Sequence, residues 1–308
     1  MNKDRVGFIG IGLMGHGMAK NLVLKGHPLK FRVHRNRDNV ADLLAAGAVE
    51  AASNADCAAD VDVVFVCVTG SPQVESIVYG PDGLLEAARP GLFVVDTSTS
   101  EPESTARIRA DFAARGVTFV DAPLTRTPKE AEEGRLNTMV GADPAAFERL
   151  RPVLSAFCEN VFHVGPPGHG TVIKLVNNFV SLAQIAAIAE GYAAAAKAGV
   201  DLRKLFELMS AGAVNSGLLQ GMIGGALEGD LGRLKFAIAN AQKDLRYYTH
   251  LTESLPMASP VAEAVHQSFV QASALGLGEK FTPSMLELQE KLNGIRIVHR
   301  HPGPGRAE

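Results

Sequence analysis

A glycine-rich segment near the N-terminus constrains the fold of this chain more than any other stretch. An apolar run that begins at Val6 breaks at Gly10, Gly12 and Gly15, and helix-forming residues follow. The order of strand, tight turn and helix suits a dinucleotide pyrophosphate, because N–H groups at a helix N-terminus bind anions. Gly10 permits the turn, Gly12 lets backbone approach the phosphates, and Gly15 lets the helix pack on the strand. We therefore expect a dinucleotide-binding, Rossmann-type domain, with Leu13 and Met14 also beside the cofactor.

The end of the second predicted strand, 29–34, bears on which dinucleotide is bound. An acidic residue there would accept hydrogen bonds from the adenosine ribose 2′-hydroxyl, but this chain continues His34, Arg35, Asn36, Arg37. Two guanidinium groups suit a 2′-phosphate by charge and by forked hydrogen bonding. The alternative is a solvated basic turn, with Asp38 facing the ribose. We favour NADP over NAD, with His34, Arg35 and Arg37 as cofactor ligands.

The first 165 residues alternate between strand and helix patterns. Further strands are predicted at 61–68, 92–97, 117–122, 136–141 and 160–165, and helices at 42–46, from 102, and at 144–157. This alternation predicts a doubly wound parallel sheet in a domain spanning 1–165. Ligands bind such sheets at the carboxyl ends of the strands, so we expect Val68, Thr69, Ser98 and Thr99 near the cofactor or substrate. We read residues 124–133 as a polar loop at the same edge.

After residue 165 the apolar residues recur at helical intervals. We expect a long helix over 172–197, followed by helices near 202–210, 217–227, 236–251, 260–274 and 283–291. These form an all-helical domain over 166–295, and the Pro- and Gly-containing tail over 296–308 is predicted to be disordered. The long helix carries more apolar surface than a small helical domain can cover. A partner subunit, giving a dimer or tetramer, is therefore expected.

Composition excludes several classes of function. A net charge of −3 over 308 residues gives no basic excess for nucleic acid. The three cysteines are far apart in sequence, which favours buried thiols in a reducing compartment over a metal site. No signal peptide is evident before the first strand, and Lys174 and Glu190 in the most apolar stretch argue against a membrane span. We expect a soluble, cytoplasmic, metal-free protein.

Five motifs occur in order along most of the chain. They are the glycine segment at 10–19, Asp-Thr-Ser-Thr-Ser-Glu-Pro at 96–102, Asp-Ala-Pro-Leu at 121–124, Gly-Thr-Val-Ile-Lys-Leu-Val-Asn-Asn at 170–178, and Lys-Asp-Leu at 243–245. In these motifs, and up to about residue 293, the chain resembles the β-hydroxyacid dehydrogenase family, which contains 3-hydroxyisobutyrate dehydrogenase and tartronate semialdehyde reductase. The resemblance implies an NAD(P)-dependent oxidoreductase acting on a short β-hydroxyacid or its semialdehyde.

Lys174 is the candidate catalytic residue. It lies four residues before Asn178, so both side chains share one face of a helix. Its apolar surroundings would lower its pKa toward the working range of an acid or base. The spacing alone leaves open a packed lysine stem with a solvated ammonium group. The family resemblance implies that Lys174 donates a proton to the carbonyl oxygen during reduction, and that Asn178 holds the substrate.

The other motif positions carry binding roles by the same resemblance. Ser98 is expected at the substrate and Thr99 at the nicotinamide, although residues of these types often only cap loops. Lys243 matches a second family lysine that approaches both substrate and nicotinamide, and its alternative is a solvated helix charge. Asp244 is read as structural.

The loop after Pro123 departs from the family pattern. The family continues Val-Ser-Gly-Gly, whereas this chain continues with Leu124, Thr125, Arg126 and Thr127. The departure predicts a guanidinium in the substrate pocket, suited to a carboxylate, sulfonate or phosphate, with Thr125 and Thr127 beside it. This run resembles the sulfolactaldehyde reductase branch, which also accepts succinic semialdehyde. The alternative is that Arg126 points to solvent.

Two other functions remain open for a chain with this glycine motif. An imine reductase shares the scaffold but usually lacks the lysine, so Lys174 speaks against it. A non-catalytic cofactor-binding protein is the second alternative, and the presence of Lys174, Asn178 and Lys243 speaks against that reading.

Overall fold

The computed structural model describes residues 3–34, 37 and 40–299, and they fall into two compact units. The first unit is Met1–Leu175 and the second is Val176–Glu308. The division lies ten residues beyond the predicted boundary of 165, inside helix α8 (His169–Lys197). The first turns of α8 belong with the first unit because their backbone is hydrogen-bonded to its sheet.

The first unit is built on one nine-stranded sheet with the order β3-β2-β1-β4-β5-β6-β8-β7, in which β9 also pairs with β8. The six strands from β3 to β6 in this order are parallel, which confirms the predicted Rossmann-type sheet. The strands are β1 (Val6–Ile9), β2 (Leu29–Arg32), β3 (Val49–Glu50), β4 (Val63–Val66), β5 (Phe93–Asp96), β6 (Thr118–Asp121), β7 (Leu124–Thr125), β8 (Leu136–Gly141) and β9 (Cys158–Gly165).

The sheet is mixed rather than parallel at β8, which the predicted doubly wound sheet did not include. This strand runs antiparallel to both β6 and β7, and only β9 is parallel to it. A parallel return requires a crossover of a dozen or more residues, usually a helix lying over the sheet. Here the connection from β6 holds only β7 and the five-residue helix α6 (Pro128–Glu132), which packs on α1 (Gly15–Leu24).

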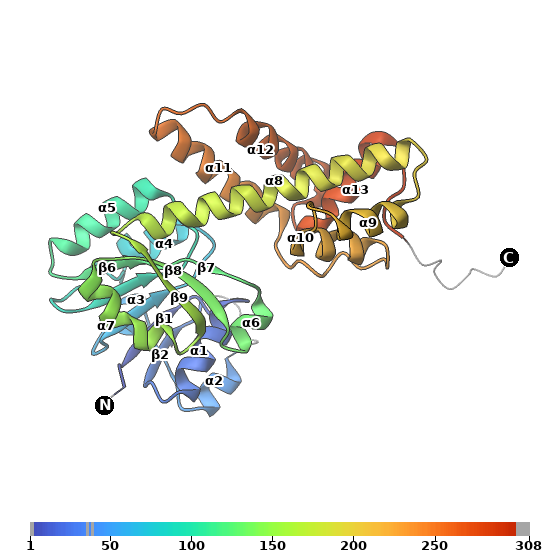
Figure 1. The fold of residues 1–308 in the computed structure, drawn as a ribbon. Coiled ribbons are helices and arrows are strands. Elements are labelled where there is room, and N and C mark those ends of the chain that lie inside the picture. Colours follow the sequence, from blue (N-terminus) through green and yellow to red (C-terminus); the bar gives the residue numbers. More distant parts are fainter. Residues whose placement is uncertain (1–2, 35–36, 38–39, 300–308) are drawn as a thin grey trace. The chain divides into compact units, whose positions relative to one another are not determined.

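Helices cover both faces of the sheet, as Figure 1 shows. Helices α1, α2 (Ala41–Ala45) and α7 (Pro144–Leu154) share one apolar cluster with the sheet, while α3 (Asn54–Ala58), α4 (Ser71–Tyr79) and α5 (Pro102–Ala113) share another. Side chains alternate along a strand, so Val63 and Phe65 of β4 enter the first cluster and Val64 and Val66 the second. This two-sided burial explains the nearly continuous apolar run in β4.

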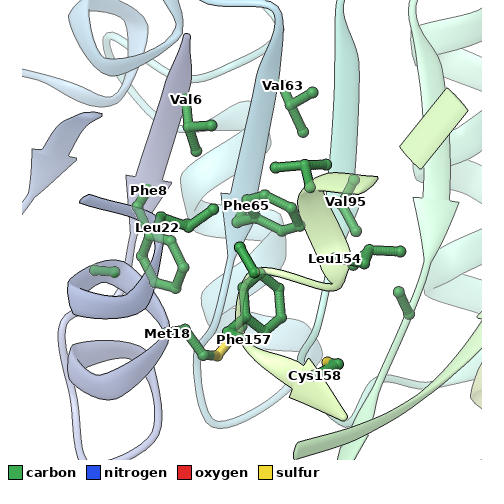
Figure 2. Packing of buried hydrophobic residues seen from close by; sticks show 14 of the residues in the cluster. Val6, Phe8, Met18, Leu22, Val63, Phe65, Val95, Leu154, Phe157 and Cys158 are labelled. Carbon is green, nitrogen blue, oxygen red and sulfur yellow. The ribbon is translucent and has the colours of Figure 1, made fainter. Parts of the chain in front are cut away.

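Three aromatic rings form the centre of the first cluster (Figure 2). The Phe65 ring lies 6.1 Å from the Phe8 ring and 5.3 Å from the Phe157 ring, which it meets edge-on. All three side chains are fully buried. They join β1, β4 and the residues that follow α7 into one packed layer.

The second unit is helical, as expected. Its core contains Leu182, Tyr192 and Phe269. The predicted helix over 217–227 is interrupted, since a wider π-turn at Gln220–Gly224 follows the short helix α10. Besides the part of α8 that belongs to this unit, the elements are α9 (Leu202–Ala211), α10 (Gly217–Leu219), η1 (Gln220–Gly224), α11 (Ile238–Ser254), α12 (Pro260–Ala272), η2 (Ser273–Leu277), η3 (Thr282–Ser284) and α13 (Met285–Asn293).

The predicted disordered tail is wrong for its first residues. Ile297 and Val298 are buried in the core of the second unit, and their N–H groups donate to the Glu290 carboxylate at 2.7 and 2.8 Å. Ile295 also packs against this core, so the segment is held by apolar contacts. Residues 300–308 lie outside the described residues.

Helix α8 is the one helix, within the described ranges, that is long and apolar enough to cross a membrane. It nevertheless carries Lys174 and Glu190. In the second unit Val176 and Val180 on this helix are 43% and 48% exposed. Part of its apolar surface is therefore not covered by this unit.

Candidate functional site

The turn after β1 has the geometry that the glycine pattern predicts. Gly10 has a φ of +105°, and a Cβ on it would lie 2.1 Å from the Cys67 carbonyl oxygen, so no other residue fits. The sheet order reverses here, because β1 leads outward to β2 on one side and pairs with β4 on the other. Ligands bind at such a switch point in open α/β sheets.

The N-terminus of α1 faces this turn and fits a pyrophosphate. A Cβ on Gly15 would lie 1.9 Å from the Gly10 carbonyl oxygen, which agrees with the expected close packing of helix on strand. At Gly12 no atom lies within 4 Å of the space that a Cβ would fill, so the backbone there is open to a ligand. The first turn of α1 has no acidic residue, and Met14 makes no side-chain cap hydrogen bond. Leu13 is exposed beside it.

The basic residues after β2 are only partly described. Arg35 lies outside the described residues, and His34 is exposed. The guanidinium of Arg37 forms an ion pair with the carboxylate of Glu50 on β3, with one nitrogen–oxygen distance of 2.9 Å. An incoming 2′-phosphate would therefore compete with this carboxylate for Arg37.

The loops after β4 and β5 are joined through Asp96. Its carboxylate accepts hydrogen bonds from the Ser98 N–H at 2.9 Å and from the Ser100 hydroxyl at 2.7 Å. The Ser98 hydroxyl in turn accepts the Val68 N–H at 3.0 Å. Ser98 and Val68, both predicted site residues, thus lie side by side at the carboxyl edge of the sheet. Thr69 is exposed and Thr99 half-buried in the same two loops.

The expected polar loop over 124–133 is ordered secondary structure instead. After β7, Thr127 caps helix α6: its hydroxyl accepts the Lys129 N–H at 3.3 Å and donates to Glu130 at 2.5 Å. The Glu130 carboxylate accepts the Thr127 N–H at 3.0 Å, which completes a capping box. The motif Thr-Pro-Lys-Glu is visible in the sequence and could have predicted this helix. Both polar groups of Thr127 serve the helix start, and Thr125 precedes it on β7.

Arg126 has a positive φ of 81°, which is uncommon for a residue other than glycine. Its guanidinium contacts the carboxylate of Glu159 on β9 and the carbonyl oxygen of Arg135. The charge predicted to meet the substrate is therefore partnered within the first unit. An incoming anion would have to compete with Glu159 for it.

His16 lies in the first turn of α1, and its contacts could not be predicted from the sequence pattern. Its Nδ1 is 2.5 Å from the Glu132 carboxylate on α6, and its Nε2 is 3.1 Å from the Asp42 carboxylate on α2. Burial alone would lower the pKa of His16, but the hydrogen bonds to the two carboxylates outweigh it and raise the pKa. The sequence signal that could have identified this residue is a histidine inside the glycine motif.

Helices α1 and α6 touch along their backbones near the same place. A Cβ on Gly17 would lie 2.4 Å from the Ala131 carbonyl carbon, so the two helices leave no room for a side chain there. The Asn21 amide donates to the Ala131 carbonyl oxygen at 3.0 Å, and the Lys20 ammonium lies 3.1 Å from Glu132. Helix α1 thus holds α6, the helix that follows Arg126 and Thr127.

Asp121 is a second residue whose contacts were not predicted from the sequence. It ends β6, and its two carboxylate oxygens accept the N–H groups of Gly168 and Thr171 at 2.7 and 2.8 Å. Burial raises the pKa of this carboxyl to about 6, against the effect of the hydrogen bonds. Its place in the Asp-Ala-Pro motif was the sequence signal.

Lys174 and Asn178 lie one turn apart on α8, as predicted. Lys174 is half-buried. In the second unit the Asn178 amide donates to one oxygen of the Asp244 carboxylate at 2.6 Å, and the Lys243 ammonium lies 2.7 Å from the other. Asp244 is only 3% exposed, and the Lys243 ammonium also lies 4.7 Å from the centre of the Tyr247 ring. Asp244 therefore joins two predicted substrate ligands.

The cysteines and metal-binding residue types suggest no further site. Burial raises the pKa of the Cys57 thiol to about 12 and that of Cys67 to about 11, so neither is a reactive thiolate. Over residues 3–34, 37 and 40–299, no three His, Cys, Asp or Glu side chains are grouped so that they could hold a metal ion.

Comparison with known families matches both units. Residues 5–165 match the NAD binding domain of 6-phosphogluconate dehydrogenase, and residues 168–288 match the NAD-binding region of NADP-dependent 3-hydroxyisobutyrate dehydrogenase.

Individual relatives cover nearly the whole chain. A 2-(hydroxymethyl)glutarate dehydrogenase of Eubacterium barkeri is 31% identical over 95% of this chain and 97% of its own length. A 3-sulfolactaldehyde reductase of Escherichia coli K12 is 31% identical over 92% of this chain and 94% of its own length. A solved structure of Psf3 in complex with NADP+ and 2-OPP has a TM-score of 0.80 and 28% identity, and covers 92% of this chain and 99% of that one.

Proposed function

Because this chain belongs to the β-hydroxyacid dehydrogenase family, we propose that it interconverts a short β-hydroxyacid and its semialdehyde, with Lys174 as general acid and base. The relatives are oxidoreductases of hydroxy and aldehyde acids. NADP is supported as the cofactor by the match to an NADP-dependent family and by the NADP+ in a similar structure, and NAD remains an alternative. When bound, the cofactor supplies or accepts the hydride at the substrate carbon.

The arrangement around Asp244 is the observation that carries this proposal. A buried carboxylate that binds both the Asn178 amide and the Lys243 ammonium keeps two polar groups of the second unit in fixed orientations. Asn178 stands one helical turn after Lys174 on α8, so the same helix orders both groups. An amide and an ammonium so placed suit an anionic, oxygen-rich substrate.

The proposed reaction needs one proton at the substrate oxygen. In the reducing direction the Lys174 ammonium donates a proton to the carbonyl oxygen as hydride adds to the carbonyl carbon, which gives the alcohol and a neutral amine. Solvent then returns the proton to Lys174. In the oxidising direction the neutral amine takes the hydroxyl proton. Lys174 thereby stabilises the charge that develops on oxygen, which is the main demand of this step.

Substrate recognition is proposed for Ser98, Thr125, Asn178 and Lys243. The Ser98 hydroxyl accepts a backbone N–H, which leaves its own proton to donate to a substrate oxygen. Arg126 joins this set only by exchanging Glu159 for the substrate's anionic end. The proposed substrate is therefore a small aldehyde acid with a carboxylate, sulfonate or phosphate at its far end.

We further propose that the protein is a cytoplasmic homo-oligomer that binds neither nucleic acid nor membrane. The net charge of −3 and the charged residues within α8 support this. The exposed Val176 and Val180 side chains support a subunit contact on that helix.

The test is an absorbance assay of NADPH and NADH oxidation with succinic semialdehyde, sulfolactaldehyde, tartronate semialdehyde and methylmalonate semialdehyde. The Lys174→Met variant should lose turnover by at least about 100-fold and still bind NADPH with wild-type affinity. The matched control is Lys197→Met, at the exposed far end of α8, which should keep wild-type turnover. Comparable kcat in the Lys174 variant, or no turnover of any of the four acids by the wild type, would contradict the proposal.

A further inference from the structure

Asp121 connects the sheet of the first unit to the helix that carries Lys174. The residue is 2% exposed, and each of its two carboxylate oxygens accepts one backbone N–H, from Gly168 and from Thr171. Thr171 is in the first turn of α8, and Gly168 directly precedes the helix. A carboxylate from a neighbouring strand thus occupies the place that an N-cap side chain usually fills.

Those backbone groups need such a partner. The first N–H groups of a helix have no acceptor inside the helix, and when buried they cost free energy unless another group accepts them. A carboxylate there also interacts favourably with the helix dipole. No capping side chain of α8 itself is needed, because Asp121 meets both demands.

The backbone at the start of α8 packs directly against the sheet. A Cβ on Gly170 would lie 2.4 Å from the Met139 carbonyl oxygen on β8 and 2.7 Å from the Asp121 carbonyl oxygen. Only a glycine lets the first turn of α8 approach β6 and β8 this closely. Position and direction of the helix start are therefore set jointly by this contact and by the Asp121 carboxylate.

Lys174 follows one turn later, three residues after Thr171, so its backbone is hydrogen-bonded into the turn that Asp121 holds. All of these residues belong to the first unit. We propose that Asp121 is a positioning residue whose carboxylate fixes the first turn of α8 and thereby places the Lys174 ammonium for proton transfer. This inference rests on the proposed function of Lys174 and adds a residue that acts through it.

The charge of Asp121 bears on how the contact would respond to pH. The carboxyl, whose pKa burial raises to about 6, loses its charge in mildly acidic solution, and a neutral acid is a weaker acceptor of two N–H groups. The other charged group that acts on it among the described residues is Asp96 on β5, which raises its pKa further. Turnover should therefore decline below about pH 6 in the wild type.

The test compares Asp121→Asn and Asp121→Ala with Asp143→Asn. The amide keeps one acceptor oxygen and the shape of the residue, so the asparagine variant is expected to fold. Asp143 is a matched control, because it is an exposed residue at the start of α7 and makes no side-chain cap hydrogen bond. We expect kcat to fall about 10-fold in Asp121→Asn and about 100-fold in Asp121→Ala, since misplacing a catalytic group by about 1 Å can cost 100-fold. KM and NADPH affinity should change less than about 3-fold, and Asp143→Asn should match the wild type.

Two further readouts separate positioning from general destabilisation. Hydrogen exchange of a peptide covering residues 166–175 should accelerate by at least about 10-fold in Asp121→Asn, with no change in peptides from the opposite edge of the sheet. The acid decline of kcat near pH 6 should also disappear in this variant.

Wild-type kcat in Asp121→Asn, with or without faster exchange, would overturn the assignment. A fall in kcat with unchanged exchange at 166–175 would overturn it as well, because the loss would then not come from the helix start. If the wild type turns over none of the aldehyde acids, the proposed function fails. The hydrogen-exchange rate of the 166–175 peptide alone then decides whether Asp121 fixes the first turn of α8.

Discussion

From the ion pair between Arg37 and Glu50 we predict how a substitution at Glu50 changes the choice between NADPH and NADH. Replacing Glu50 with Gln removes the carboxylate that holds the Arg37 guanidinium and leaves the backbone of β3 in place. We expect the freed guanidinium, a proposed ligand of the 2′-phosphate, to bind NADPH without first giving up a partner. Because NADH has a hydroxyl at this position, the change should favour NADPH alone.

The size of the effect follows from the exposure of the pair. The two side chains are 62% and 21% exposed, and pairs so exposed are typically worth about 0.2–1 kcal/mol. Removing that competition should lower the Kd for NADPH by about 1.4- to 5-fold. The opposite change, Arg37→Ala, removes a charged donor to the phosphate, worth about 1.5–3 kcal/mol, and should raise that Kd by about 10- to 150-fold.

Fluorescence titration of the four proteins (wild type, both single variants and the double variant) with NADPH and NADH measures these constants. In the Arg37→Ala background, Glu50→Gln should bring no further gain for NADPH, and the Kd for NADH should change less than about 2-fold throughout. Equal weakening of NADPH and NADH by Arg37→Ala would refute the reasoning, as would tighter NADPH binding in the double variant than in Arg37→Ala.

Two other predictions concern stability. The pKa of His16 is raised in the folded protein, so its contribution is fully present below the unfolded value of about 6.5 and is lost as the pH rises through the folded pKa. The Tm difference between wild type and His16→Gln should therefore be larger at about pH 6 than at about pH 9, and an equal difference at both would contradict the assignment. Phe157→Ala should cost about 3–5 kcal/mol, because a fully buried ring is removed from contact with Phe65. Urea unfolding measures this cost, and the control Phe162→Ala, at a 51% exposed ring on β9, should cost far less.

The sequence predicted the parts of the fold that local pattern determines. The glycine segment and the β-branched run of β4 each carry their own signal, and the structure has a parallel sheet at both places. The direction of β8 carried no such signal, since a strand pattern does not say which neighbour it will meet. The wrong expectation there came from extending the alternation of strands and helices to β8, although only β7 and the five-residue helix α6 lie between β6 and β8.

In the candidate site, too, relations within one motif were predictable from the sequence and contacts between distant segments were not. Positions within one motif, such as Lys174 and Asn178, could be related by helix periodicity alone. Partners distant in the sequence could not, which is why the Glu159 contact of Arg126, the Glu50 contact of Arg37 and the role of Asp121 emerged only from the structure. Each of these depends on which strands lie next to one another.

The close backbone contact between α1 and α6 also restricts how this protein can change its substrate. The segment that follows Arg126 is held against α1 through Gly17, Asn21 and Glu132. An insertion or deletion between residues 124 and 134 would displace α1 and the glycine turn proposed to bind the pyrophosphate, so altered specificity should come with altered cofactor affinity. Variants selected for a new substrate should therefore carry point substitutions in this segment and keep its length.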